Sequence, residues 1–320
     1  MTRILRDEDV RRAALFPETV HRLADDLRAD RDAPEGAKAR SIVRVEGGWL
    51  RIMSGVLPNH DLLGFKAFHM IGDTIRYLTT LYRLSTGEPL AAVDAAHLTV
   101  ARTSAAAAAA AHHFWDDDPI SVAVIGTGLQ ATDGIRALAS VCRITSVTVF
   151  SPREESRRAF VETLDDELPF PIRAAASARD ACAGVDMVLC GTLTRGRVAL
   201  DRDDVDPQTK YISSISSTLP VQREIDGRII ADADVLIVDT EDALEESGDL
   251  LDAREHGLDH ERVVLLSEYL SEPVDERPRT VYKSIGSVEQ DLSIAYAALV
   301  ASDGDSIGAD IAEIESARVV

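Results

Sequence analysis

The hydrophobic and polar positions follow two different periods in the N-terminal third of the chain. Residues 1 to about 32 are predicted to be helical, because apolar residues recur every three or four positions in DEDVRRAALF and PETVHRLADDLRAD. The period then becomes two, which predicts strands in ARSIVRVEGGWLRIMSGVLP, LLGFKAFHM and IRYLTTLYRLSTGEPLAAVD, with turns at GG and STGEP. We therefore expect a β-rich N-terminal domain with helices in front of it.

A run of alanines interrupts this pattern and predicts a helix over ARTSAAAAAAAHHFW. Alanine has the highest intrinsic helix propensity, and the hydroxyl of Thr103 or Ser104 is suited to cap the start of this helix. A helix with such small side chains can pack closely against other backbone. The acidic DDDP at 116–119 ends the helix, and we expect the second domain to begin there.

From residue 120 onward, short β-rich runs alternate with helical ones. Strands are predicted in SVAVIG, ITSVTVF, DMVLCGT, YISSISS and ADVLIVD, and helices in LQATDGIRALASVC and REESRRAFVETLDDEL. This alternation is typical of an α/β fold with a doubly wound parallel sheet. A last helix, in VYKSIGSVEQDLSIAYAALVAS, is expected to return to the first domain. The predicted domains are an α+β domain at 1–118, completed by 284–320, and a dinucleotide-binding domain at 119–283.

The first turn of the second domain carries a glycine pattern that binds phosphates in many α/β proteins. In SVAVIGTGLQA a strand runs into a turn of the form G-x-G-x-x-A, and a helix follows. The first glycine allows the tight turn, the second lets backbone approach a pyrophosphate, and the helix N-terminus faces the phosphates. The alternative is a purely structural turn. We expect a dinucleotide to be bound by Gly126, Thr127, Gly128, Leu129 and Gln130.

The end of the second strand of this domain separates NAD from NADP. An acidic residue there would bind the ribose 2′-hydroxyl of NAD, but the chain has Ser151-Pro152-Arg153. A hydroxyl and a guanidinium suit a 2′-phosphate, because arginine offers a planar fork of donors. NADP(H) is therefore favoured over NAD(H). The alternative is that the arginines of this segment only pair with its glutamates on a solvated helix face.

The composition narrows the classes of partner. The 320-residue chain has a formal net charge of -21, which argues against nucleic acid or an anionic membrane as a partner. No apolar run is long enough to span a membrane and the N-terminus is charged, so we predict a cytoplasmic protein. The three cysteines have no metal-ligand spacing and are expected to be buried free thiols. No metal site is predicted, since HGLDHE lacks a third candidate ligand.

Four patches of the chain together resemble the ornithine cyclodeaminase/μ-crystallin family: FKAF, ARTSAAA, VIGTGLQA and the run ESGDL…TVYKSIGSVEQDL. The resemblance covers nearly the whole length. It implies a Rossmann domain, a homodimer whose N-terminal β domain forms the interface, and a substrate pocket between the two domains. Family activities include cyclodeamination of ornithine or lysine, alanine dehydrogenation and reduction of ketimines, and μ-crystallins also bind thyroid hormone.

The resemblance also implies a carboxylate clamp in the N-terminal domain. Arg40 and Arg102 match family arginines, which can grip an α-carboxylate with two hydrogen bonds each. Lys66 matches the active-site lysine, which with a lowered pKa can donate a proton to an imine or amine nitrogen. Thr80 matches a pocket threonine, although Thr79 is adjacent and the strand register decides between them. For the arginines and the lysine, the alternative is a structural ion pair.

One position departs from the family pattern. Cyclodeaminases and the related alanine dehydrogenases carry an aspartate in the segment that reads SSISSTLPVQREID here, and alignment on Pro220 and Glu224 puts Thr218 in its slot. A threonine hydroxyl ionises far too weakly to act as a base near neutral pH. Ketimine reductases of the family have a small hydroxyl residue there, so the departure favours imine reduction over cyclodeamination.

The remaining family positions lie near the cofactor. We assign Thr192 to the cofactor site and expect Lys283 and Ser284, in VYKSIG, to return near the nicotinamide. Asp291, on the helix that follows, is given a structural role.

The sequence thus favours an NAD(P)H-dependent imine reductase or, in reverse, an amino-acid dehydrogenase. Arg40, Lys66 and Arg102 hold the carboxylate of a small, cyclic imino acid, hydride passes to the α-carbon, and Lys66 or a water protonates nitrogen. Two alternatives stay open. One is a cyclodeaminase that releases ammonia, with Glu224 or Asp226 in place of the missing carboxylate. The other is a non-enzymatic ligand-binding protein of the μ-crystallin type.

Overall fold

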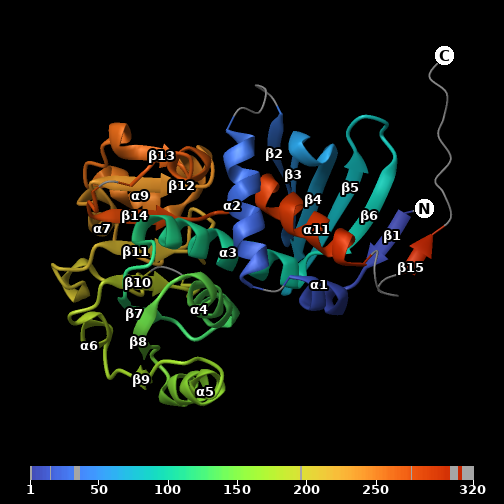
Figure 1. The fold of residues 1–320 in the computed structure, drawn as a ribbon. Helices are drawn as coiled ribbons and strands as arrows, with labels where there is room; N and C mark the ends of the chain where they lie inside the picture. Colours follow the sequence, from blue (N-terminus) through green and yellow to red (C-terminus); the bar gives the residue numbers. More distant parts are fainter. Residues whose placement is uncertain are drawn as a thin grey trace. The chain divides into compact units, whose positions relative to one another are not determined.

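The computed structural model describes residues 2–14, 16–31, 37–194, 197–274, 276–302 and 309–311. The chain divides into two compact units, residues 1–102 with 287–320 and residues 103–286 (Figure 1). The division falls within the alanine helix rather than after residue 118, because the end of that helix packs into the second unit, with the ring of Phe114 5.1 Å from that of Tyr211. No helix among the described residues is long and apolar enough to cross a membrane.

The first unit is a seven-stranded sheet that carries helices on one face (Figure 1). Five antiparallel strands follow one another: β2 (Lys38–Val45), β3 (Gly48–Leu57), β4 (Leu62–Ile71), β5 (Thr74–Arg83) and β6 (Pro89–Asp94). β1 (Thr2–Leu5) pairs parallel with β6, and β15 (Ala309–Ile311) pairs antiparallel with β1. Helix α11 (Val288–Ser302) packs across β3, β4 and β5, and α1 (Asp7–Ala13) and α2 (Glu18–Asp30) pack against α11. A short turn of 3-10 helix, η1 (Pro58–His60), joins β3 to β4.

Two local predictions in this region were wrong. Residues 2–5 form strand β1 rather than a helix, because tertiary pairing with β6 and β15 overrides the local pattern. Helix α3 (Ala96–Trp115) begins two turns before Thr103 and Ser104, so these residues lie inside the helix and do not cap it. The carboxylate of Asp94 accepts the backbone N–H of Ala96 at 3.1 Å and marks the true start.

The second unit is an eight-stranded, all-parallel sheet in the order β13-β12-β14-β11-β10-β7-β8-β9, which confirms the predicted doubly wound fold (Figure 1). Its strands are β7 (Ile120–Ile125), β8 (Ile144–Phe150), β9 (Ile172–Ala174), β10 (Met187–Cys190), β11 (Tyr211–Ser214), β12 (Val235–Val238), β13 (Val263–Leu265) and β14 (Thr280–Lys283). Its helices after α3 are α4 (Leu129–Val141), α5 (Glu154–Asp165), α6 (Ala178–Cys182), α7 (Gly227–Ala231), α8 (Ala243–Glu246), α9 (Gly248–Glu255) and α10 (Leu266–Tyr269), with single 3-10 turns η2 (Arg202–Asp204) and η3 (His260–Arg262). The strand order reverses between β7 and β10, which is where such sheets bind ligands.

Candidate functional site

A row of side chains crosses the first unit from β2 to β5. The strand register places Arg40 opposite Met53, Met53 opposite Lys66, and Lys66 opposite Thr79. Because directly paired residues point to the same face of a sheet, these four side chains share one face. That face is the one that α11 covers on β3, β4 and β5, so Met53, Lys66 and Thr79 are buried beneath a helix, while Arg40 on β2 is half-buried.

The carboxylate of Asp291, on α11, contacts this row of side chains. Its Oδ1 accepts a hydrogen bond of 2.9 Å from Lys66 Nζ and lies 3.3 Å from Arg102 Nε. The guanidinium of Arg102 also donates to Gln290 Oε1 at 3.0 Å. Lys66 is 1% exposed and Asp291 is fully buried. We call Arg40, Lys66, Arg102 and Asp291 the cation cluster; the structure brings together the three predicted clamp residues and adds a carboxylate.

The surroundings of Lys66 make its ammonium a usable acid near neutral pH. Burial, which disfavours the charged form, lowers the pKa of Lys66 from 10.5 to about 8, Asp291 opposes this shift, and Arg102 adds to it. The ammonium also lies 5.2 Å from the ring centre of Phe68 and 5.4 Å from that of Tyr77, where the electron-rich faces stabilise a cation. A group with this pKa can both give and regain a proton during turnover.

The cation cluster has unused hydrogen-bonding capacity and an excess of positive charge. The positive charges of Arg102 and Arg40 both act on Lys66, and the carboxylate of Asp291 opposes them. Asp291 Oδ2 and the hydroxyl of Thr79 are buried and have no hydrogen-bond partner among the described residues. Unpaired buried polar atoms cost about 1–3 kcal/mol each, so a polar, anionic ligand on this face would be stabilised. A carboxylate matches both the charge and the fork of arginine donors.

The register decides which of the two adjacent threonines shares the face of Lys66, and the contacts add two residues to the predicted set. Thr80 pairs with Phe65 and points to the face opposite Lys66, so Thr79 is the threonine of the cluster. The two-residue period of the strand explains the error, because a shift of one position reverses every side chain. Asp291 was given only a structural role, and Tyr77 was missed. The lysine and the aspartate are 225 positions apart in the chain, and no local pattern connects them.

The glycine turn of the second unit has the shape that a dinucleotide requires. Gly126 has φ of 113°, and a Cβ there would lie 2.7 Å from the carbonyl oxygen of Gly191, so the position needs glycine. Gly128 precedes the first turn of α4 and has open space around its α-carbon, which leaves room for a pyrophosphate. The N–H groups of the first turn of α4, beginning at the exposed Leu129, are available to phosphates.

The end of β8 carries a basic group and no acidic one. Ser151 is buried there, and Arg153 forms the N-cap of α5. Arg157 donates to the carbonyl oxygen of Ser151 at 2.5 Å and stacks its guanidinium on the ring of Phe150 at 5.7 Å. Among the described residues, no ion pair joins Arg153 or Arg157 to the glutamates of the same helix turn, so the solvated-face alternative lacks support here.

A second polar network lies at the carboxyl ends of β10, β11 and β14. Lys283 Nζ donates to Ser214 Oγ at 2.9 Å and lies 2.8 Å from Asp249 Oδ2 and 4.0 Å from Glu224 Oε2. Glu224 accepts hydrogen bonds from Ser214 Oγ at 2.7 Å and from the backbone N–H of Thr192 at 2.6 Å. Burial raises the pKa of Glu224 from 4.5 to about 7, Lys283 opposes the shift, and Asp249 adds to it. We call Lys283, Asp249 and Glu224 the acidic network.

This network changes the roles of three predicted residues. The ammonium of Lys283 is fully buried and paired with Asp249 inside the unit, and its place near the nicotinamide stays a prediction. Thr192 is half-buried, and its backbone N–H donates a hydrogen bond to Glu224 Oε1. Ser284 donates its N–H to the carbonyl of Ser214 at 3.0 Å, and its buried hydroxyl has no partner among the described residues.

Thr218 lies in the loop after β11, half-buried, with its backbone N–H bonded to Gln222 Oε1 at 3.0 Å. The two nearby carboxylates, which are the alternatives to the aspartate of cyclodeaminases, are both engaged elsewhere. Glu224 is committed to the acidic network, and Asp226 caps α7 and pairs with Arg228. The Thr218 loop therefore offers no free carboxylate.

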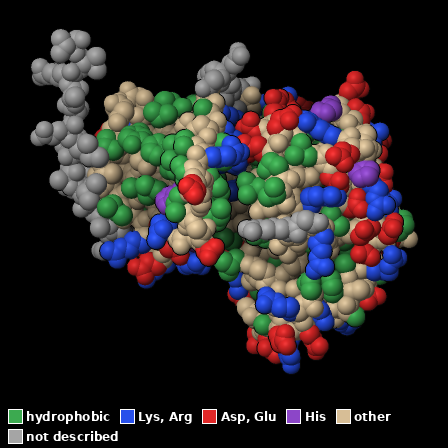
Figure 2. All heavy atoms as spheres, turned by 180° about the vertical axis from the view of Figure 1, so that it is seen from behind, with side chains coloured by type: hydrophobic (Ala, Val, Ile, Leu, Met, Phe, Trp, Pro, Cys, Tyr) green, Lys and Arg blue, Asp and Glu red, His purple; other side chains and the backbone are tan. Residues whose placement is uncertain are grey.

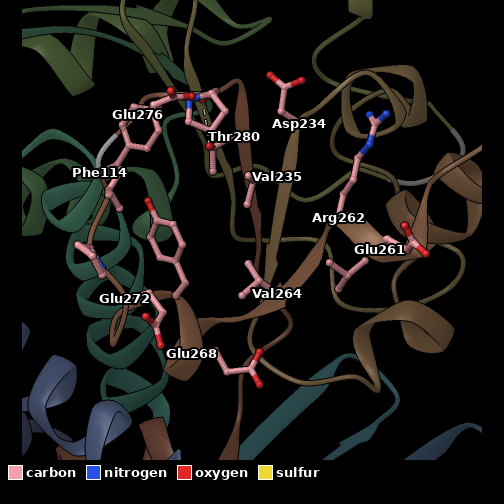
Figure 3. A pocket seen from close by; sticks show the side chains of 15 residues that line it. Phe114, Asp234, Val235, Glu261, Arg262, Val264, Glu268, Glu272, Glu276 and Thr280 are labelled. Carbon is pink, nitrogen blue, oxygen red and sulfur yellow. Dashed lines mark hydrogen bonds between the residues drawn. The ribbon is translucent and has the colours of Figure 1, made fainter.

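A separate hollow of about 570 Å³ lies in the second unit, and Figure 3 shows the side chains that line it. The start of β12 at Val235 and the start of β14 at Thr280 border it, together with Phe114 and Tyr269. The strands of a parallel sheet all begin on the same side of the sheet. This hollow therefore lies at the amino ends of the strands, whereas the dinucleotide turn lies at their carboxyl ends.

Comparisons with known proteins agree with this geometry. A delta(1)-pyrroline-2-carboxylate reductase of Bacillus cereus is 27% identical over 259 residues, which cover 76% of this chain and 78% of that protein. The same enzyme from Thermococcus litoralis, in complex with NADH and L-proline, superposes with a TM-score of 0.85 at 21% identity, over 97% of this chain and all of that one. An archaeal alanine dehydrogenase dimer with bound NAD gives a TM-score of 0.84 at 23% identity, over 98% and 99% of the two chains. The model of the ornithine cyclodeaminase/mu-crystallin family matches residues 1–300, and the chain belongs to that family.

Proposed function

We propose that the protein is an NAD(P)H-dependent reductase of cyclic α-imino acids, which in reverse acts as an amino-acid dehydrogenase. The observation that carries the proposal is the cation cluster, in which Arg40 and Arg102 act on the buried Lys66, whose pKa of about 8 suits proton transfer. The absence of a free carboxylate in the Thr218 loop supports reduction over cyclodeamination. The relative from Bacillus cereus acts on pyrroline-2-carboxylate, which is a substrate of this class.

Each predicted residue receives a defined task in this reaction. The guanidinium groups of Arg40 and Arg102 bind the substrate carboxylate and orient the C=N bond. A dinucleotide whose pyrophosphate is held at the glycine turn would supply the hydride for the imine carbon. Lys66 donates a proton to the imine nitrogen and regains it from solvent. Thr218 contributes a hydroxyl, which cannot deprotonate a second amine of the substrate.

We favour NADP(H) as the cofactor because Arg153 stands at the end of β8, where an acidic residue would select NAD(H). The neighbouring Arg157 already bonds the carbonyl of Ser151, whereas Arg153, at the N-cap of α5, is exposed and can meet a 2′-phosphate. Nicotinamide cofactors are present in the related structures from Thermococcus litoralis and from the archaeal alanine dehydrogenase.

The deciding experiment follows absorbance of NADPH or NADH with pyrroline-2-carboxylate and piperideine-2-carboxylate, with an ammonia assay on ornithine plus NAD in parallel. Imine-dependent oxidation, faster with NADPH, without ammonia from ornithine is the expected result. Ammonia released with no net change in the cofactor would mean that the Thr218 argument is wrong and that the enzyme is a cyclodeaminase. Cofactor and ligand binding without turnover in either assay would identify a non-enzymatic binding protein.

We also propose a homodimer that uses the face of the first sheet not covered by α11. Val43 and Leu50 pair across β2 and β3 on this face and are exposed, as are Leu63 and Leu78. Figure 2, viewed from the side opposite Figure 1, shows hydrophobic side chains gathered over this sheet. Exposed apolar patches on a sheet face are typical of association surfaces. The expected mass by light scattering is that of a dimer, and Val43→Glu with Leu78→Glu is expected to give monomers. The cytoplasmic location stays a prediction.

A further inference from the structure

Asp291 occupies a position that helix capping alone does not explain. It lies in the first turn of α11, where a carboxylate complements the helix dipole. An exposed aspartate would serve that purpose, yet this one is fully buried and shared between Lys66 and Arg102. Burying a carboxylate is costly unless it is paired, so the pairing with the two cations is what stabilises it there.

The charges around Lys66 show what Asp291 does for that residue. Arg40 reaches it from β2, Arg102 from α3 and Asp291 from α11, while Tyr77 on β5 presents a neutral ring. Arg51 on β3 lies further off, over the ring of Phe68, and Glu289 of α11 is paired with Lys38. Asp291 is therefore the one negative charge among these described residues that favours a proton on Lys66.

We propose that Asp291 is a positioning residue for the imine reaction: its carboxylate holds the ammonium of Lys66 on the face of the sheet and keeps it protonated for delivery to the substrate nitrogen. The inference rests on the proposed imine reduction. Without Asp291, two arginines would face Lys66 with no counter-ion, and the neutral amine would be favoured.

The electrons and protons of this step are supplied by the cofactor, Lys66 and water. The reduced nicotinamide would lose hydride from one of its C–H bonds and be oxidised, a C–H bond would form at the imine carbon, and the C=N π electron pair would move to nitrogen. This pair takes a proton from Lys66 Nζ, so one N–H bond breaks on the lysine and one forms on the substrate. Lys66 is left as a neutral amine and is protonated again by water. Asp291 forms no covalent bond and transfers no proton.

The first test compares pH profiles of kcat for the wild type, Asp291→Asn and Asp291→Glu. In the wild type, kcat for imine reduction is expected to fall as the pH rises through about 8, because Lys66 loses its proton. In Asp291→Asn this fall in kcat is expected to begin at lower pH. Each pH unit by which it is displaced lowers kcat about tenfold at the pH values above it. Activity should return as the pH is lowered. Asp291→Glu keeps the negative charge, so its kcat is expected to fall over nearly the same pH range as that of the wild type, although the kcat itself is reduced.

A matched control is Asp26→Asn. Asp26 is also a buried carboxylate of the first unit, and it joins α2 to α11 through Ser293 Oγ at 2.6 Å, but it does not touch Lys66. Loss of this carboxylate is expected to lower the melting temperature and to leave the pH at which kcat falls unchanged. If Asp291→Asn lowers kcat by the same factor at every pH, as a merely structural role would, the inference is overturned.

The second test reads the charge of Lys66 without using turnover. Acetic anhydride acylates only neutral amines, so its rate with Lys66 at a series of pH values, followed by mass spectrometry of the peptide, gives the titration of that group. The exposed Lys210 serves as an internal reference. Acylation of Lys66 should begin at lower pH in Asp291→Asn than in the wild type; an unchanged titration contradicts the inference. A shifted titration in a protein with no imine activity would instead refute the proposed function and leave the pairing intact.

Discussion

Each unit of the molecule buries one lysine against a carboxylate, and the two sites differ in the charges that surround the pair. Lys66 lies 2.9 Å from Asp291, and Lys283 lies 2.8 Å from Asp249. Around Lys66, two arginines add positive charge, and Asp291 Oδ2 and the Thr79 hydroxyl have no partner among the described residues. Around Lys283, Glu224 adds negative charge, and Ser214 accepts a further hydrogen bond.

The difference indicates which buried ion pair is a binding site and which is a support. An excess of cations attracts an anionic ligand and lowers the pKa of the lysine, as at Lys66. An excess of carboxylates leaves no place for an anion and raises the pKa of one acid, as at Glu224. Burial of a lysine and a short contact to a carboxylate are common to both, so neither property alone identifies a functional residue.

The largest expected effect is on turnover at Lys66. Lys66→Met should lower kcat for imine reduction by roughly 100- to 10,000-fold, because it removes the proton donor. The fold should persist, because Arg102 still pairs with Asp291. Steady-state kinetics and thermal unfolding of the same preparation check both points. If Lys66→Met keeps a kcat within threefold of the wild type, another group protonates the substrate.

The corresponding change in the other unit should act on stability. Lys283→Met leaves Asp249 and Glu224 buried without their cation, which is expected to cost about 3–5 kcal/mol of unfolding free energy. Urea unfolding measures this cost. Lys210→Met, at an exposed lysine, is the control and should change the stability little. If Lys283→Met is as stable as this control and binds NADPH more weakly, Lys283 contacts the cofactor as the family resemblance implies.

The two sites should also give opposite slopes of stability with pH. Glu224 has a pKa near 7 in the folded state against 4.5 as its ordinary value, so its contribution is fully present below 4.5 and is lost as the pH rises through 7. Its size is on the order of 3 kcal/mol. Lys66 has the reverse sign: its pKa is lowered from 10.5 to about 8, so stability rises between these values.

Chemical denaturation across this pH range should therefore show a fall in unfolding free energy from acid to neutral pH. The fall should be absent in Glu224→Gln, while the rise above pH 8 should be absent in Lys66→Met. A slope near neutral pH that survives Glu224→Gln would assign it to other groups.

The sequence was sufficient for features that depend on local pattern. The G-x-G-x-x-A turn, the alternation of strands and helices after residue 120, and the family patches around Lys66 and Arg102 led to the correct fold and family. The missed features depend on pairing between distant segments. Strand β1 exists because β6 and β15 flank it, and Asp291 acquires its role only where α11 crosses β4. Lys283 matches a family motif equally well whether it faces the cofactor or the interior, and only its burial beside Asp249 separates the two.

The smallest effect tests the strand register within the cation cluster. Thr79 shares the face of Lys66, whereas the adjacent Thr80 points to the opposite face. Thr79→Val keeps the shape of the side chain and removes a buried hydroxyl that has no partner among the described residues. If this hydroxyl bonds the substrate, its loss costs about 0.5–1.5 kcal/mol and lowers kcat/KM for the imine by about two- to tenfold. Thr80→Val is the matched control and should leave kcat/KM unchanged. An effect of Thr80→Val without one of Thr79→Val would mean that β5 is shifted by one residue against β4 in solution, so that Thr80 rather than Thr79 shares the face of Lys66.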